Sequence, residues 1–113
     1  MRTLNDYFIT AEIEDVSTAS STFVAVPDGG KIIKILSANQ ATITGTAALS
    51  FEIGGTAVTG GGISIVASGS AGAIDTAEPT GANTVTEGGS IEMITDGGST
   101  NTSKAVVTFV IRR

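Results

Sequence analysis

The chain is built almost entirely of short apolar segments that are separated by glycine-containing turns. Its 15 glycines gather at sites such as Gly29-Gly30, Gly54-Gly55 and Gly60-Gly61-Gly62. Glycine adopts the backbone angles of tight turns at little steric cost, so paired glycines between apolar segments are typical of β-hairpins. Nowhere do apolar residues recur at the spacing that an amphipathic helix requires. The pattern predicts an all-β protein with essentially no helix.

Two kinds of strand can be distinguished. Residues 6–14 and 49–53 alternate between apolar and polar side chains, as strands with one buried face do. Residues 31–37 and 104–111 are apolar on both faces, which is typical of strands inside a sheet or pressed against a neighbour. We expect a second sheet of the same domain, rather than another subunit, to cover them. Further short strands are expected at residues 23–26, 56–59, 63–67, 73–76, 83–86 and 91–95.

About eight short strands at this spacing predict one antiparallel β-sandwich or jelly roll. The 113 residues suit a single domain, which we place at residues 6–113. Residues 16–22 are rich in Ser and Thr and are expected to form a loop. Residues 68–83 are expected to form a long surface loop with one short strand.

The composition argues against an enzyme. The chain has no His, no Cys and no Trp, and it has one Tyr. Catalytic bases and nucleophiles are most often His or Cys, so we expect no enzymatic activity and no cofactor. A hydrolase that uses only paired carboxylates is disfavoured, because the candidate acids lie in a polar loop or on outward strand positions. These acids are Asp75, Glu78, Glu52 and Glu92.

One loop has the oxygen-rich composition of a calcium site. It contains Asp96, Ser99, Thr100 and Asn101, but their spacing departs from that of a calcium-binding loop. Turn geometry already explains Asp96-Gly97-Gly98. We therefore expect no bound metal.

The charge balance limits the possible partners. With 6 basic and 11 acidic residues the net charge is −5, which opposes binding to nucleic acid. Residues 1–15 contain four acids and no uninterrupted apolar run, so we expect neither a secretory signal nor a membrane span. The basic residues either blunt strand edges or dock onto an acidic partner. They are Arg2, Lys31, Lys34, Lys104, Arg112 and Arg113.

Four segments carry a resemblance to a known family. They are residues 1–8 (MRTLNDYF), 26–31 (VPDGGK), 53–61 (IGGTAVTGG) and 96–113, which begins DGGSTN and ends VTFVIRR. In pattern and size the chain resembles small virion proteins of tailed bacteriophages, namely the capsid decoration or cement proteins. Those proteins are added to the outer face of the major capsid shell.

The resemblance implies a non-enzymatic structural role. It implies synthesis in the host cytoplasm, binding to the major capsid protein on the outer surface of the virion, and stabilisation of the mature head. It also implies association with other copies as a trimer on the capsid. Such proteins use a terminal arm to reach a neighbouring capsid subunit, and the matching positions here are Met1 to Asn5.

The residues expected to contact the shell lie at the two ends of the chain, outside the predicted core. They are Arg2, Leu4, Asn5, Arg112 and Arg113. The alternative is that both ends are disordered tails. The 68–83 loop is then expected to face solvent or a neighbouring copy.

A second functional class stays open. Loops rich in Ser, Thr, Asn and Gly suit a receptor-binding or carbohydrate-binding β-sandwich of a phage tail fibre or a bacterial surface. Sugar sites, however, usually stack a ring of the ligand on an aromatic side chain, and this chain has no Trp and one Tyr.

Overall fold

The computed structural model describes residues 5–67 and 69–113, and within them the chain contains ten strands and no helix. The strands are β1 (Asp6–Ile13), β2 (Ser20–Ala25), β3 (Gly30–Asn39), β4 (Ala47–Ile53), β5 (Thr56–Ala57), β6 (Ile63–Ile65), β7 (Ile74–Ala77), β8 (Thr84–Val85), β9 (Ser90–Thr95) and β10 (Ala105–Arg112). The described part therefore holds no helix that could cross a membrane.

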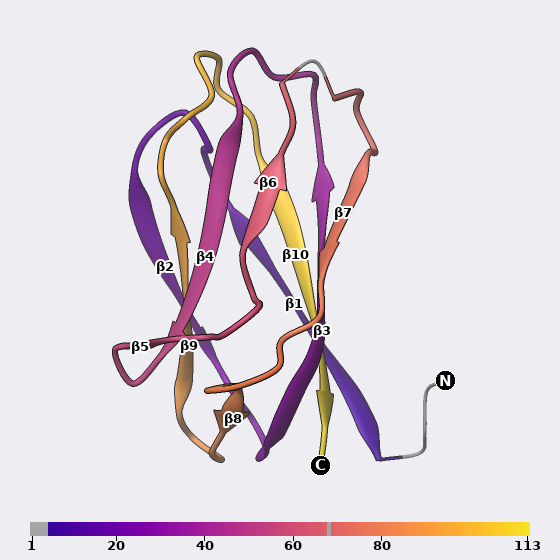
Figure 1. Ribbon diagram of the computed structural model, residues 1–113, viewed down its shortest axis with the longest axis vertical. Coiled ribbons are helices and arrows are strands. Elements are labelled where there is room, and N and C mark those ends of the chain that lie inside the picture. The colour runs from indigo at the N-terminus through magenta and orange to yellow at the C-terminus, as the bar shows by residue number, and fades with distance from the viewer. Residues whose placement is uncertain (1–4, 68) are drawn as a thin grey trace.

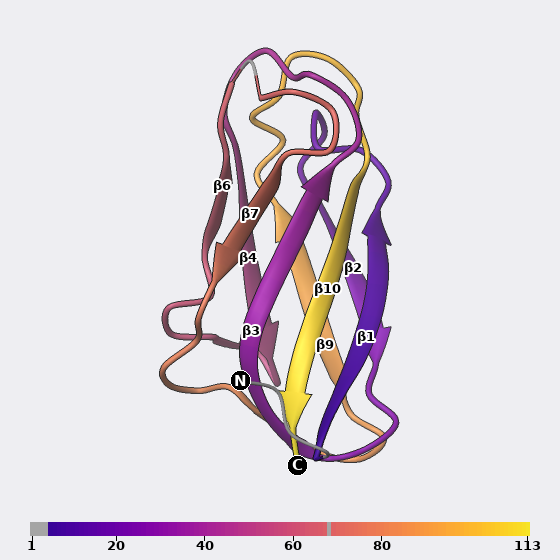
Figure 2. The same ribbon diagram turned by 90° about the vertical axis from the view of Figure 1, so that its right-hand side faces the viewer.

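The strands form two antiparallel sheets that pack face to face. Sheet A has the order β1-β10-β3-β7, with β8 also paired to β3. Sheet B has the order β2-β9-β4-β5, with β6 also paired to β4. Figures 1 and 2 show the two layers from directions 90° apart. The predicted all-β sandwich is confirmed.

The core between the sheets is made of aliphatic side chains around one aromatic pair. Phe51 of β4 and Phe109 of β10 lie with ring centroids 5.5 Å apart at an interplanar angle of 88°. This edge-to-face arrangement is favoured by the charge distribution of aromatic rings. Because Phe51 comes from sheet B and Phe109 from sheet A, the pair joins the two layers at the centre.

The strands that are apolar on both faces occupy the middle of sheet A, as predicted. β10 pairs with β1 on one side and with β3 on the other. Sheet B covers their inner faces, where Val107 and Ile35 are fully buried. Their outer faces point away from sheet B, and Val106 and Leu36 there are only half-buried. The expectation that a second sheet covers these strands is therefore confirmed for one face only.

One predicted loop is wrong in part. Residues 16–22 were expected to be a loop, but β2 begins at Ser20 and pairs with β9 along its whole length. Val16 is fully buried, and its N–H donates to the Ser103 carbonyl oxygen at 2.9 Å. Ser and Thr are permitted in a strand at the edge of a sheet, where their hydroxyl groups remain in water.

The long 68–83 segment contains one short strand, as expected. Its strand β7, predicted at residues 73–76, runs from Ile74 to Ala77 and pairs with β3. Gly69 to Ala73 and Glu78 to Asn83 connect this strand to its neighbours, and Ser68 lies outside the described residues. One strand of this segment thus joins sheet A, and loop residues flank it on both sides.

The loop after β9 is held against the loop before β4. Asp96 Oδ1 accepts the backbone N–H groups of Ala48 at 2.9 Å and Gly98 at 2.8 Å. Gly98 lies so close to the other loop that a Cβ atom there would be 2.1 Å from the carbonyl oxygen of Thr46. Only glycine permits this approach.

Substituting Gly98 tests this packing. We expect Gly98→Ala to lower the free energy of unfolding by about 1–3 kcal/mol, because the added methyl group overlaps the Thr46 carbonyl. Gly62→Ala is the matched control, since its Cβ would lie 3.9 Å from the nearest atom, and its effect should stay within about 0.5 kcal/mol. Urea unfolding of both variants measures the difference. Equal stabilities would contradict the close approach.

Candidate partner-binding site

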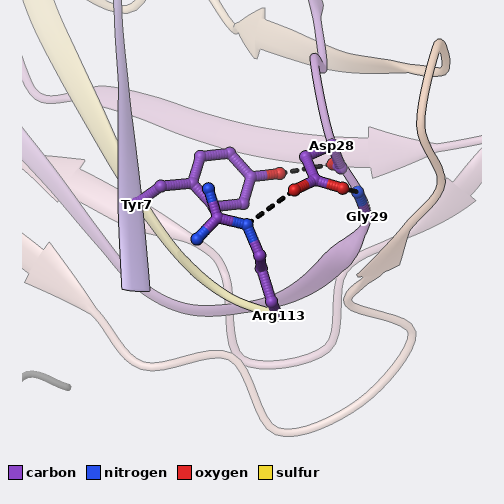
Figure 3. A network of polar contacts seen from close by, with 4 residues as sticks. All are labelled: Tyr7, Asp28, Gly29 and Arg113. Carbon is purple, nitrogen blue, oxygen red and sulfur yellow. Dashed lines mark hydrogen bonds and ion pairs between the residues drawn. The ribbon is translucent and has the colours of Figure 1, made fainter. Parts of the chain in front are cut away.

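The C-terminal residues meet the turn before β3 at one end of the sandwich (Figure 3). Arg113 Nε donates to Asp28 Oδ2 at 2.6 Å, and its guanidinium carbon lies 4.6 Å from the centroid of the Tyr7 ring. The Tyr7 hydroxyl donates to the carbonyl oxygen of Asp28. These contacts join the start of β1, the turn and the end of β10.

This network shifts two pKa values. The hydrogen bonds from Arg113 and from the Gly29 N–H hold the pKa of Asp28 below its usual value. Partial burial raises the pKa of Tyr7, and the nearby Asp28 carboxylate raises it further. The ionised carboxylate and the neutral phenol are therefore the forms that the fold favours.

Arg112 forms a second ion pair beside the first. Its Nε lies 2.8 Å from Asp6 Oδ1 and its Nη2 lies 3.1 Å from Asp6 Oδ2. The Asp6 side chain is 1% exposed and that of Arg112 is 41% exposed. Such a two-point contact matches the planar guanidinium group to the carboxylate, and it raises the pKa of Arg112.

The structure brings together three of the five residues expected to contact the shell. Asn5 is exposed, and its carbonyl oxygen accepts the Arg113 N–H at 3.1 Å. Arg112 and Arg113 are ion-paired within the chain, yet their side chains remain 41% and 45% exposed. Arg2 and Leu4 lie outside the described residues. A contact through these residues stays a prediction.

A hollow of about 360 Å³ lies beside these arginines. It is lined by Gly30, Lys31, Ile33, Thr84, Arg112 and Arg113. Three of the chain's six basic residues therefore border one hollow. Sequence reasoning named both arginines but not Ile33 or Thr84. Thr84 lies beside the hollow because β8 pairs with the start of β3, where Lys31 is its register partner. No local sequence pattern indicates that pairing.

A larger hollow of about 650 Å³ lies at the opposite end of β1 and β10 and includes Glu14, Asp15 and Lys104. Asp15 Oδ1 accepts the N–H and the hydroxyl of Ser17 at 2.8 and 2.6 Å. Hydrogen bonding to Ser17 lowers the pKa of Asp15. This carboxylate organises its own loop in the way that Asx turns do.

The loop considered for calcium uses its oxygens within the fold. Asp96 Oδ1 accepts two backbone N–H groups, and Asn101 Oδ1 accepts the Thr44 N–H at 2.7 Å. Across residues 5–67 and 69–113, no group of three or more Asp or Glu side chains is placed to hold a metal ion. The geometry gives these side chains a structural role.

Two of the acids considered for hydrolysis are direct neighbours. Glu52 of β4 and Glu92 of β9 are register partners on the outward face of sheet B. Neither of them lines either hollow. Like charges directly opposite each other on a sheet are unfavourable unless water or a cation screens them.

One solved structure shares this fold across nearly the whole chain. It is a chain of the acidic stable capsid structure of Helicobacter pylori bacteriophage KHP30, with a TM-score of 0.62, 14% identity, and coverage of 96% of this chain and 87% of that chain. At this identity the likeness shows a common fold. The two coverages also show that the two chains are of similar length.

Two weaker likenesses are to proteins of other kinds. Latent PorU from Porphyromonas gingivalis has a TM-score of 0.48 and 14% identity, with coverage of 96% of this chain and 13% of that chain. PirA has a TM-score of 0.45 and 11% identity, with coverage of 97% and 96%. Neither of these likenesses carries functional information. No protein-family model and no curated protein sequence matches the chain.

The ion pair between Asp28 and Arg113 should make stability depend on pH. The pKa of Asp28 is lowered in the folded chain. Its ionised form therefore stabilises the fold above the unfolded pKa of about 3.9, and this contribution is lost as the pH falls through the folded pKa. We expect Asp28→Asn to melt below the wild type at neutral pH, with a gap that closes in acid.

Thermal unfolding at a series of pH values from about 7 down to about 2 measures that gap. Asp15 also has a lowered pKa, but it is present in both proteins and cancels in the difference. A gap of constant size across the whole series would show that the Asp28 charge does not stabilise the fold.

Proposed function

We propose that this protein is a non-enzymatic structural component of a bacteriophage virion, which binds the outer surface of the major capsid protein lattice and stabilises the mature head. The observation that carries the proposal is the fold shared, over 96% of this chain, with a chain of similar length from a bacteriophage capsid structure. The resemblance of its sequence segments to capsid decoration proteins points to the same role.

The chemistry of the chain suits such a task. The chain has no His and no Cys, and several acids of the described part are engaged in ion pairs or loop hydrogen bonds, among them Asp6, Asp28 and Asp96. Binding to many repeated sites adds free energy to the whole particle even when each contact is modest. A cement protein of this kind needs a rigid surface and no reactive group.

The candidate contact residues fit one orientation on the shell. Asn5, Arg112 and Arg113 lie together at one end of the sandwich, and the 360 Å³ hollow beside them is bordered by basic side chains. In the proposal these residues contact the capsid, the arm of residues 1–5 extends to a neighbouring shell subunit, and three copies meet around a symmetry axis of the lattice.

Counting the protein in purified virions tests the proposal. We expect quantitative mass spectrometry to find it at a copy number equal to that of the major capsid protein or a simple fraction of it, because a cement occupies every equivalent lattice site. A handful of copies per particle would instead favour the receptor-binding alternative at the tail. Absence from virions would rule out both.

Removing the arm tests its role separately. We expect deletion of residues 1–4 to weaken binding to shells that lack the protein while leaving the melting temperature unchanged. Asn5 is kept because its carbonyl oxygen accepts the Arg113 N–H. Co-sedimentation with shells measures binding, and thermal unfolding is the control. Unchanged binding would remove the arm from the proposal without affecting the rest.

A further inference from the structure

The outward face of sheet A carries several apolar side chains although it points away from sheet B. Phe8 of β1 and Ile74 of β7 are 59% and 56% exposed. Leu36, Ala38 and Val106 between them are half-buried. Figure 2 shows this face toward the viewer, with β7, β3, β10 and β1 side by side. Strands that are apolar on both faces are normally covered on both, so this face has the character of an interface.

The register places these side chains in continuous rows. Phe8, Val110 and Lys34 are partners across β1, β10 and β3. Val110 is only 3% exposed, although it lies on the outward face and outside the core cluster. This low exposure is consistent with neighbouring side chains covering Val110, among them the aliphatic stem of Lys34. In the next row the Thr10 and Thr108 hydroxyl oxygens lie 3.3 Å apart. The side chains of this face therefore pack against one another along the rows.

The charges of the molecule are divided between its two sheets. Five of the six basic residues lie in the described part, and all five are on β3 or β10 or directly beside them. They are Lys31, Lys34, Lys104, Arg112 and Arg113. The strands of sheet B carry no basic residue, and their outward face holds the opposed Glu52 and Glu92.

The two acids on the outward side of β1 are already paired with basic residues. Asp6 pairs with Arg112, and Glu12 lies 3.5 Å from Lys104. Lys31 and Lys34 form no ion pair with any described residue. The outward face of sheet A therefore combines apolar side chains with an excess of positive charge, whereas that of sheet B carries an excess of negative charge.

We propose that the outward face of sheet A is the surface that docks the protein onto the shell, at an apolar patch of the capsid protein that carries carboxylates. This inference rests on the proposed function and adds the docking face and the chemistry of the partner. The same carboxylates repel Glu52 and Glu92, so attraction to one sheet and repulsion from the other determine which way the protein lies.

A second copy of the chain could also bind the outward face of sheet A, since the outward face of its sheet B is acidic. The outward faces of the two sheets point in opposite directions (Figures 1 and 2). Contacts from sheet A of one copy to sheet B of the next would therefore repeat without closing and would build an open string. A shell surface satisfies the charge and the apolar area of sheet A without that consequence.

The chain offers a matched pair of aromatic residues for the test. Phe8 is 59% exposed on sheet A and Phe23 is 66% exposed on sheet B, and both point outward from edge strands. We expect Phe8→Ala to weaken binding to protein-free shells by about tenfold or more, as loss of an aromatic anchor does. Phe23→Ala should change it by no more than about twofold. Both variants should keep the wild-type melting temperature.

Charge variants test the partner's chemistry. We expect Lys34→Glu to weaken shell binding and to flatten its dependence on salt, because the attraction to carboxylates is lost. Glu52→Lys replaces one of the two opposed carboxylates of sheet B with a positive charge and should leave binding unchanged or tighter. Co-sedimentation at about 50 and about 300 mM salt measures both effects.

The outcomes separate the inference from the function on which it rests. If wild-type protein binds shells but Phe8→Ala and Phe23→Ala bind equally well, or Phe23→Ala is the weaker, the docking face is wrong and the proposed function stands. If wild-type protein instead forms chains in solution that Phe8→Ala abolishes, the face belongs to a second copy. If wild-type protein binds no shell at all, the proposed function itself fails.

Discussion

The pairing of β10 with both β1 and β3 is the interaction on which the rest of the structure depends. It makes a continuous antiparallel sheet from the first strand, an early strand and the last strand of the chain. On the inner side it presents Phe109 to Phe51 of the other sheet. At its end it delivers Arg112 to Asp6 and Arg113 to Asp28. One strand thus carries the centre of the core and closes one end of the sandwich.

The same pairing produces the division of charge. Lys31 and Lys34 are on β3, and Lys104, Arg112 and Arg113 flank or end β10, so pairing these two strands gathers the positive charge of an acidic chain on one sheet. Sheet B receives Glu52 and Glu92 as direct neighbours. Such an uneven charge distribution affects which partner the protein binds, and in which orientation, more than it affects the stability of the fold.

Much of the fold could be predicted locally. The strands at residues 6–14 and 49–53 were found because their alternation marks one buried face, and the central position of residues 31–37 and 104–111 followed from two apolar faces. The start of β2 was missed because Ser20 to Thr22 carry no apolar alternation.

In the candidate site, Arg112 and Arg113 were named from their position and charge, but Asp6, Asp28 and Thr84 become their neighbours only through sheet pairing.

The sequence by itself determined the fold class, because glycine turns and period-two segments favour strands over helices. Only the tertiary structure decided which apolar face is buried and which is left outward. Val106 and Val107 are equally apolar, yet one is half-exposed and the other fully buried. The physical reason is that alternation assigns side chains to two faces, whereas the packing of sheet B against one of them, through contacts distant in the sequence, selects the core.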